Sequence, residues 1–453
     1  MMQWLGRWRG WIILVLLTAA FYTHFGRASF NAPYYAEAGR CIWRGAALLP
    51  CLPQFPYQPA LAALFIPFSF IPAALQNPVW YVICVGSLVL TVRLAEAMAE
   101  QLYPGATHGR NLVWLRIIVL VTCAKHILDV LIYAAYDAPA LAMMTLGIWA
   151  LCVGRDGAGG LWLGLAAAIR ATPVIYMPYL LLKRRYLACV ASIAAFIAVS
   201  LLPEIVGALH GSHTGYFNDW VRQVVAPTMV PGSSPNLVFW DTWNNAVNLY
   251  NQSLRGLINR LAQGPVFGFS PTTILIAADG AFAAVLAVLL LSSPRKEEYA
   301  AIDGAMLLIA ILVLSPMTSR YHYIFVLPAV ILVSAAAITD RRIHVLASIV
   351  LGVSFLLRAG TSNDVAGQTV TDFAYMYGFM PAGAIVLYIA FAAMLWVWHP
   401  PGISERESKT PEGAFTRPEP ALASPEPVPA ITAVRELDGS VTIPVSQKNR
   451  PPR

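Results

Sequence analysis

The sequence predicts an all-α protein that crosses a membrane about ten to twelve times as helices. Hydrophobic residues make up 58% of the 453 residues, and charged residues only 12%. A soluble chain of this length would need about a quarter of its residues charged to cover its surface. This composition excludes a large soluble enzyme and a nucleic-acid binder.

Apolar segments of the length that a bilayer requires follow one another up to residue 399. The expected spans lie near residues 11–25, 59–74, 79–99, 112–134, 138–153, 160–182, 187–207, 271–292, 301–318, 321–339, 343–359 and 379–399. We interpret the first as a retained helix, because no small-x-small cleavage site follows it. Segment 59–74 is short and contains three prolines, which favours a half-helix or re-entrant element.

Segment 160–182 is interrupted by Ala171-Thr172-Pro173 at its midpoint, and Arg170 precedes this break. If the segment is a hairpin of two short helices, Arg155 and the basic cluster 183–185 lie on the same side and Arg170 is at the tip. If it is one span, Arg170 is buried at mid-membrane. In both cases the guanidinium needs a partner, because an unpaired cation in hydrocarbon costs at least ~2.5 kcal/mol.

The net charge of +7 is concentrated partly in short basic clusters beside apolar runs, which indicate topology. They predict a cytoplasmic N-terminus and two extracytoplasmic loops, about 26–57 and 208–270, both rich in Trp and Tyr. Such loops are typically functional. The alternative is a pair of aromatic helices lying on the membrane. The Pro-rich residues 400–453 predict a disordered cytoplasmic tail after a membrane domain of residues 1–399.

The six cysteines form no CxxC pair and have no metal-ligand spacing, so no metal is expected. Cys41 and Cys51 both fall in the first outer loop. An oxidising compartment would allow a bridge between them, and free thiols are the alternative.

Four stretches, in order along residues 25–340, resemble one known family. They are Phe55-Pro56-Tyr57-Gln58-Pro59, the run GLWLGLAAAIRATPVIYMPYLLLKRRY at 160–186, Asn251-Gln252-Ser253-Leu254-Arg255-Gly256 with Arg260, and the stretch from Ser315-Pro316 through His322 to Leu327-Pro328. They are similar to stretches of glycosyltransferase family 87, polyprenyl-phosphate-mannose-dependent enzymes of the GT-C superfold.

The resemblance implies an inverting sugar transfer, with mannose as the expected sugar, from a polyprenyl-phosphate donor to a lipid or glycan acceptor. The donor is a substrate, and no cofactor is implied. The resemblance also implies a bacterial-type inner membrane protein whose active site lies outside the cytoplasm. Its partners would be membrane lipids and the lipid-linked donor. Neither protein partners nor the acceptor can be named from the sequence.

Three departures from the family pattern concern the chemistry. Asn31 stands where the resemblance implies a catalytic aspartate, and an amide cannot accept a proton as a carboxylate does. Ser319-Arg320-Tyr321-His322 retains only the second histidine of a Trp-x-His-His element. Tyr136-Asp137-Ala138-Pro139 replaces a glycine-glutamine-asparagine element.

Such a transfer needs cations to hold the leaving phosphate and a base near the attacking hydroxyl. We expect Arg170 and Arg320 to bind the donor phosphate. A structural ion pair is the alternative for Arg170, and an interfacial anchor is the alternative for Arg320. Arg170 should share a water-accessible chamber with the two aromatic outer loops.

Glu37, Asp137 and His322 are the catalytic candidates. The alternatives are a solvated loop carboxylate, a helix N-cap and a satisfied core histidine, respectively. Further candidate bases on the expected outer face are Asp219 and Asp241, with Asp129 one helical face away.

Five residues are expected to contact the sugar or the acceptor, since amides, phenols and guanidinium groups hydrogen-bond hydroxyls and phosphates. They are Asn31, Tyr35, Asn251, Gln252 and Arg255. For the last three, a helix cap with a solvated basic face is the alternative. The competing functions are a catalytically inactive lipid-binding or lipid-transport protein on the same scaffold and, third, a solute transporter, which the lack of an evident repeat disfavours.

Overall fold

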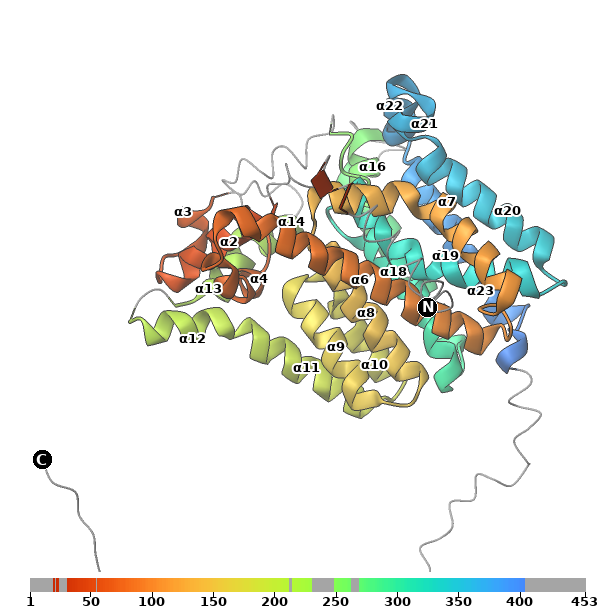
Figure 1. Cartoon of the computed structure of the whole chain (residues 1–453), viewed down its shortest axis with the longest axis horizontal. Helices are drawn as coiled ribbons and strands as arrows, with labels where there is room; N and C mark the ends of the chain where they lie inside the picture. Colours follow the sequence, from red (N-terminus) through yellow and green to blue (C-terminus); the bar gives the residue numbers. More distant parts are fainter. Residues whose placement is uncertain are drawn as a thin grey trace, which may run out of the picture. The chain divides into compact units, whose positions relative to one another are not determined.

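The computed structural model describes residues 19–20, 22–23, 31–53, 55–211, 214–229, 248–261 and 269–403. Contacts group the chain into two units, Met1–Glu407 and Ser408–Arg453, and every described residue belongs to the first. Figure 1 shows helices throughout this unit, and the predicted all-α class is confirmed for the described residues. Most of the predicted first span, 11–25, and the predicted tail from residue 404 on lie outside the described residues.

Prolines break the first part of the chain into short helices before the first long one. The helices are α2 (Asn31–Trp43), α3 (Leu48–Cys51), α4 (Pro59–Leu64), α5 (Ile66–Ser69), α6 (Ala73–Leu102), α7 (Gly109–Tyr133) and α8 (Asp137–Cys152). Pro59 and Pro67 stand in the first turns of α4 and α5, where the missing N–H costs nothing. Segment 59–74 is therefore not a single span, as its prolines predict.

Segment 160–182 forms a hairpin. The hairpin consists of α9 (Asp156–Ile169), the 3-10 helix η2 (Thr172–Ile175) and α10 (Tyr176–Leu182). Arg185 donates hydrogen bonds to the Leu151 carbonyl and to Asp156, both at 2.9 Å, so the chain returns to the end where α9 begins. The hairpin alternative is thus confirmed, and Arg170 lies at its tip.

The second part of the chain contains the remaining helices, both long and short. They are α11 (Tyr186–Ser200), α12 (Leu202–Leu209), α13 (Tyr216–Trp220), the π-turn η3 (Val221–Val225), α14 (Ala226–Met229), α16 (Leu254–Leu261), α17 (Pro271–Ser292), η4 (Glu297–Tyr299), α18 (Ala300–Leu314), η5 (Arg320–Val326), α19 (Leu327–Thr339), α20 (His344–Phe355), the π-turn η6 (Leu356–Gly360), α21 (Asn363–Ala366), α22 (Gln368–Met376) and α23 (Phe379–Trp396). Each span predicted between 79 and 399 coincides with one helix or with consecutive helices.

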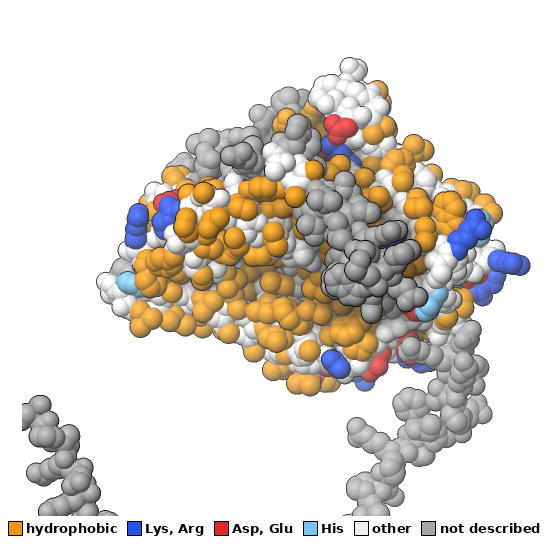
Figure 2. All heavy atoms as spheres, viewed as in Figure 1, with side chains coloured by type: hydrophobic (Ala, Val, Ile, Leu, Met, Phe, Trp, Pro, Cys, Tyr) orange, Lys and Arg blue, Asp and Glu red, His pale blue; other side chains and the backbone are white. Residues whose placement is uncertain are grey.

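Within the described residues, five helices are long and apolar enough to cross a membrane, and several shorter apolar helices pack among them. Figure 2 shows one face covered largely by hydrophobic side chains, with most charged groups near its edges. Such a surface suits lipid, and the chain is an integral membrane protein.

The hairpin packs closely against α11. A Cβ added at Gly160 or Gly164 would collide with the α11 backbone at Ala188 and Ser192. Small residues therefore let α9 approach α11, as is usual between membrane helices. This contact fixes α9 and, with it, the position of Arg170 at the hairpin tip.

The two stretches predicted as outer loops are largely helical where they are described. Residues 31–43 form α2, and α13, η3, α14 and α16 lie in the second stretch. Burial explains the difference for α2, because Tyr35, Ala36 and Ile42 are fully buried against the bundle. Among the described aromatic residues of the two stretches, Tyr35, Phe55, Tyr216 and Trp220 are buried, whereas Trp43 is exposed.

Candidate active site

A cavity of about 440 Å³ lies at the tip of the hairpin. Most of its lining is apolar, and its polar groups are a guanidinium, an imidazole, phenols, an amide and two hydroxyls. The lining residues are Pro56, Tyr57, Gln58, Tyr136, Ile169, Arg170, Ala171, Thr172, Val174, Ile175, Trp220, Val224, Val225, Ile311, Leu314, Ser315, Pro316, Met317, Tyr321 and His322. This size lies within the range of small-molecule sites.

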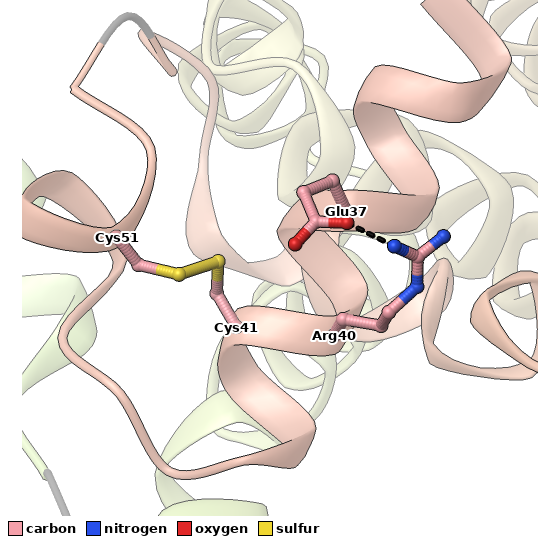
Figure 3. The surroundings of a disulfide bond; sticks show 4 residues. All are labelled: Glu37, Arg40, Cys41 and Cys51. Atoms are coloured by element: carbon pink, nitrogen blue, oxygen red, sulfur yellow. Dashed lines mark hydrogen bonds and ion pairs between the residues drawn. A yellow bond between two sulfur atoms is a disulfide. The ribbon is translucent and has the colours of Figure 1, made fainter.

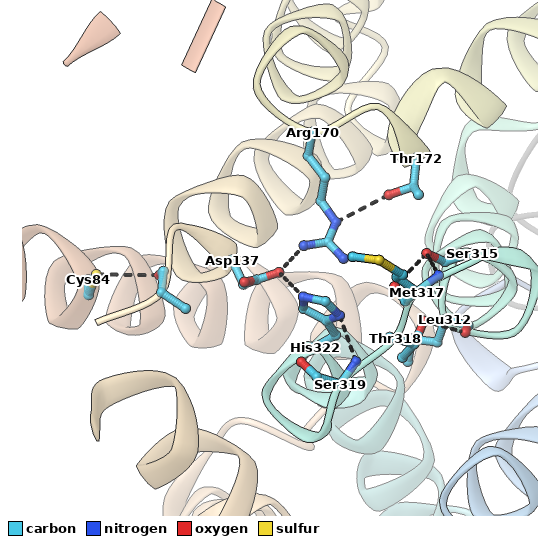
Figure 4. Close-up of polar contacts among 11 residues, drawn as sticks. Cys84, Asp137, Arg170, Thr172, Leu312, Ser315, Met317, Thr318, Ser319 and His322 are labelled. Carbon is cyan, nitrogen blue, oxygen red and sulfur yellow. Dashed lines mark hydrogen bonds and ion pairs between the residues drawn. The ribbon is translucent and has the colours of Figure 1, made fainter. Parts of the chain in front are cut away.

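Arg170 enters the cavity because α9 ends just before it. Its backbone is extended (φ −142°, ψ 115°), and the chain resumes as η2 at Thr172. The guanidinium pairs with Asp137 and donates to Thr172 Oγ1 at 3.2 Å (Figure 4). It also lies 4.7 Å from the Phe325 ring centroid. The expected partner therefore exists, and the paired side chain still lines the cavity.

Asp137 lies in the first turn of α8 and is fully buried. The N-cap residue of α8 is Tyr136, so the N-cap alternative for Asp137 is wrong. Its position follows from the turn between α7 and α8, where Ala134 is left-handed (φ 45°) and accepts a 2.7 Å hydrogen bond from Trp80 Nε1. Asp137 thus reaches Arg170 and His322, which line the cavity, without lining it itself.

His322 points toward Asp137 from the other side (Figure 4), with its Nε2 3.7 Å from an Asp137 oxygen. Its Nδ1 accepts the backbone N–H of Ser319 at 3.0 Å. A neutral ring that accepts at Nδ1 carries its proton on Nε2. His322 therefore offers a hydrogen-bond donor at Nε2, and it satisfies a backbone group at the same time.

Both predicted outer stretches contribute to the cavity wall. Tyr57 comes from the first, and Trp220 from the second, where its Nε1 donates to the Pro56 carbonyl at 3.0 Å. Arg170 accordingly shares one chamber with aromatic residues of both stretches, as the sequence predicts. Neither Tyr57 nor Trp220 is among the site residues expected from the sequence, although both lie in its aromatic-rich runs.

A disulfide between Cys41 and Cys51 braces this wall (Figure 3). It joins α2 to α3, and Leu49 of α3 packs in a small apolar cluster with Trp220 and Val224. The bridge therefore settles the alternative left open for these two cysteines and ties the first stretch to the cavity wall.

Arg320 does not line the cavity, although its neighbours Tyr321 and His322 do. It donates to Tyr133 Oη at 2.6 Å and lies 3.8 Å from Asp129. The guanidinium therefore faces α7 rather than Arg170. The two cations expected at one phosphate are not brought together.

Lys125 completes this second polar cluster. Its ammonium is 3.3 Å from Asp129 and 2.5 Å from Asp364 of α21. The hydrogen bond from Lys125 lowers the pKa of the Asp364 carboxyl, which is largely exposed. The two cations of this cluster are balanced by two carboxylates. Its ion pair between Lys125 and Asp364 connects α7 to α21.

The structure does not bring Glu37 into the cavity. Glu37 forms an ion pair with Arg40 on the same helix, and its side chain is 39% exposed (Figure 3). The geometry supports the alternative of a solvated carboxylate.

Asn31 and Tyr35 lie on α2 but are not among the cavity-lining residues. The Asn31 amide donates to the Tyr133 carbonyl at the end of α7, at 2.5 Å. Tyr35 is fully buried in an aromatic cluster with Tyr57 and Tyr136. Tyr35 therefore supports the two lining tyrosines from behind.

Asn251 and Gln252 are used to hold the chain together. The Asn251 amide donates to the Pro316 carbonyl at 3.1 Å, and the Gln252 amide donates to the Tyr375 carbonyl at 3.1 Å. Both side chains are buried, and neither residue lines the cavity. Arg255 also lies outside the lining, on α16, where it interacts electrostatically with Asp279 of α17. The geometry thus favours structural roles over sugar contact.

Among the residues that the structure describes, no three His, Cys, Asp or Glu side chains are grouped as metal ligands. What the cavity offers is a pair of donors, Arg170 and His322, beside an apolar chamber. This arrangement can bind an anionic head attached to an apolar chain.

The sequence is similar to one protein family and to several named proteins. The model of glycosyltransferase family 87 matches residues 55–319. The chain is 27% identical over 292 residues to a polyprenol-phosphate-mannose-dependent alpha-(1-2)-phosphatidylinositol pentamannoside mannosyltransferase of Mycobacterium tuberculosis. That alignment covers 62% of this chain and 59% of the relative, less than two thirds of its length.

Two proteins of Mycolicibacterium smegmatis are also similar. A protein with the same descriptive name is 24% identical over 362 residues, covering 76% of this chain and 78% of that protein. A polyprenol-phosphate-mannose-dependent alpha-(1-2)-phosphatidylinositol mannoside mannosyltransferase is 26% identical over 361 residues, covering 74% of each. No solved structure matches the chain significantly.

Proposed function

The chain belongs to glycosyltransferase family 87, and we propose that it transfers mannose from a polyprenyl-phosphate donor to a lipid-linked acceptor. The observation that carries this proposal is the cavity at the hairpin tip, where Arg170 and the Nε2 of His322 are hydrogen-bond donors in a largely apolar lining. The names of the relatives supply the sugar and the class of acceptor.

The donor's phosphate would lie against Arg170 and His322. A guanidinium binds phosphate oxygens with two parallel hydrogen bonds, and these bonds are stronger in an apolar environment. Val174, Ile175 and Leu314 provide apolar wall for the first isoprenoid units. The same cavity thus receives both the charged and the apolar part of one ligand.

In the reaction, the acceptor hydroxyl oxygen bonds to the anomeric carbon as the bond from that carbon to the phosphate oxygen breaks. Arg170 and His322 hold the charge that develops on the departing phosphate. Direct displacement inverts the anomeric carbon, because the hydroxyl approaches from the side opposite the phosphate. The proton of the hydroxyl must go to a base on that opposite side.

Asp137 pairs with the phosphate-binding groups, so it lies on the phosphate side. We therefore assign Asp137 as a positioning residue that orients Arg170 and His322, in place of the base role expected from the sequence. No Asp or Glu occurs in the described lining of the cavity. A carboxylate base would thus lie outside that described lining.

The lack of a lining carboxylate, together with Asn31, favours one second candidate, a lipid-binding protein that does not transfer the sugar. Such a protein would bind the donor through the same Arg170 and cavity. The transferase and the lipid-binding protein would differ only in whether the bound sugar is transferred.

We place the site on the non-cytoplasmic side of the membrane. The Cys41–Cys51 disulfide suits an oxidising compartment, and Arg155 and Arg184 lie at the other end of the hairpin from Arg170. Labelling of an introduced Arg44→Cys by a membrane-impermeant maleimide in intact cells would support this side. Labelling of Arg184→Cys instead would reverse it.

The decisive experiment uses the full-length protein in nanodiscs with radiolabelled polyprenyl-phosphate-mannose and phosphatidylinositol mannosides. The wild type should form a mannosylated lipid, and Arg170→Gln should lose both transfer and donor binding. Arg116→Met is a control, because Arg116 pairs with Glu96 away from the cavity. Donor binding without any product would favour the lipid-binding candidate, whereas failure of the wild type to bind donor would refute both.

A further inference from the structure

Three side chains hold the turn that connects α7 to α8. The backbone carbonyls of residues 133–135 are consecutive, and each accepts a hydrogen bond from a different side chain. The Asn31 amide of α2 donates to the first at 2.5 Å, and Trp80 Nε1 of α6 donates to the second at 2.7 Å. The Cys84 thiol, also on α6, donates to the third at 3.6 Å (Figure 4). Helices α2 and α6 therefore hold this turn from outside.

The conformation of the turn requires such support. Ala134 is left-handed (φ 45°, ψ 48°), which costs free energy in a residue that carries a Cβ. The carbonyls at the end of a helix also have no partner within the helix. Asn31, Trp80 and Cys84 are at most 8% exposed, so water competes little with their hydrogen bonds. The neighbouring helices thus supply the donors that α7 itself does not.

The Trp80 indole is in turn fixed by ring contacts. Its ring centroid lies 4.7 Å from that of Phe65 and 5.8 Å from that of Phe68. This packing fixes the direction in which the N–H points, toward the Ala134 carbonyl. Trp80 does not line the cavity, so it can act on a bound ligand only through its neighbours.

The turn leads directly into two residues that contact Arg170. Tyr136 lines the cavity, and its ring centroid is 5.8 Å from Arg170 Cζ. Asp137 follows, pairs with Arg170 and has an oxygen 3.7 Å from His322 Nε2. A shift of the turn would therefore move both groups that contact the guanidinium.

We propose that Trp80 is a positioning residue for the donor phosphate. By holding the Ala134 carbonyl, it fixes the turn that presents the Asp137 carboxylate. That carboxylate in turn orients Arg170 and His322, the two side chains assigned to the phosphate. This inference rests on the proposed function, because it concerns how the donor is bound.

The test is the affinity of the full-length protein in nanodiscs for polyprenyl-phosphate-mannose. Trp80→Phe keeps an aromatic ring but removes the N–H, and loss of this hydrogen bond should raise the Kd for donor about fivefold. Tyr81→Phe is the matched control, because Tyr81 is the next residue of α6 and is also buried. Its hydroxyl has no hydrogen-bond partner among the described residues, so the Kd of this variant should equal that of the wild type.

The Asp137→Asn background separates positioning from general destabilisation. If Trp80 acts through Asp137, adding Trp80→Phe to Asp137→Asn should change the Kd by less than about twofold, because the effects of coupled residues do not add. An equal loss of affinity in both backgrounds would assign Trp80 a purely structural role and overturn the proposal.

A second variant guards against a failure to fold. If Trp80→Phe does not fold, Asn31→Leu removes another donor of the same turn and should show the same dependence on Asp137. Failure of the wild type to bind the donor would refute the proposed function and this inference together. Wild-type binding with unchanged affinity in the variant would refute the inference alone.

Discussion

His322 accepts the backbone N–H of Ser319 at Nδ1, 3.0 Å away, and this single hydrogen bond decides what the imidazole can do in the cavity. The Nε2 proton faces Asp137 and the space proposed for the donor phosphate. In its neutral form the ring is therefore a donor there and cannot accept the proton of the acceptor hydroxyl.

Replacing His322 should accordingly slow the sugar transfer when the new side chain cannot donate a hydrogen bond to the phosphate. We expect His322→Phe to lower kcat/KM about 100-fold, the usual effect of removing one donor to a developing charge. His322→Gln keeps an N–H and should recover part of this loss. The measurement is the initial rate of mannolipid formation for the three proteins. Equal rates for the Phe and Gln variants would exclude the donor role.

Asp137→Asn separates a positioning role from a base role. If Asp137 orients Arg170 and His322, the variant should raise KM for the polyprenyl-phosphate donor with a smaller change in kcat. If Asp137 is the base, kcat should collapse while the KM for donor stays constant. Steady-state kinetics over a range of donor concentrations distinguish these outcomes.

The same variant should destabilise the fold, because it leaves the Arg170 charge without its buried partner. Breaking a buried pair from one side costs about 3–5 kcal/mol. The double variant Asp137→Asn with Arg170→Gln should regain stability, though not activity. Thermal unfolding of both proteins measures this, and equal losses in the single and double variants would show that the pair is not coupled.

The break in the hairpin can be predicted from the sequence. Which side chains meet in the cavity cannot be predicted equally well. Apolar length and the Ala171-Thr172-Pro173 break indicate where α9 ends, because these are local properties of the chain. The choice between Arg170 and Arg320 as phosphate ligands depends on which neighbour each side chain meets across the bundle. Arg320 is diverted by Tyr133 and Asp129, and no local pattern shows that contact.

Asn251 and Gln252 illustrate the same limit. Their amides suggested sugar contact, but they are satisfied by the carbonyls of Pro316 and Tyr375, which lie more than sixty residues away in the chain. A buried amide has to find such partners wherever the fold places them. The residue types therefore indicate that these side chains form hydrogen bonds, and only the structure identifies the partners.

The positions of the two cations predict different phenotypes. Arg170→Gln should abolish donor binding, because Arg170 lines the cavity. Arg320→Gln should leave the KM for donor within about threefold of the wild type, because its contacts are with Tyr133 and Asp129, outside the cavity lining. Titration of each protein with the donor checks this. Equal loss of donor affinity in both variants would return Arg320 to the phosphate site.

The disulfide offers a test of whether the wall of the cavity must be braced. Replacing both Cys41 and Cys51 by Ser should lower the stability by about 2–4 kcal/mol, because the bridge restricts the unfolded chain. It should also raise the KM for donor, because Leu49 of α3, the helix that carries Cys51, packs against Trp220 in the wall. The reducing agent dithiothreitol should reproduce both effects in the wild type and add nothing in the double variant.

Cys189→Ser is the control, since Cys189 is a free thiol on α11 outside the cavity. A double variant that is less stable but binds donor with unchanged KM would show that the bridge stabilises the fold without shaping the wall.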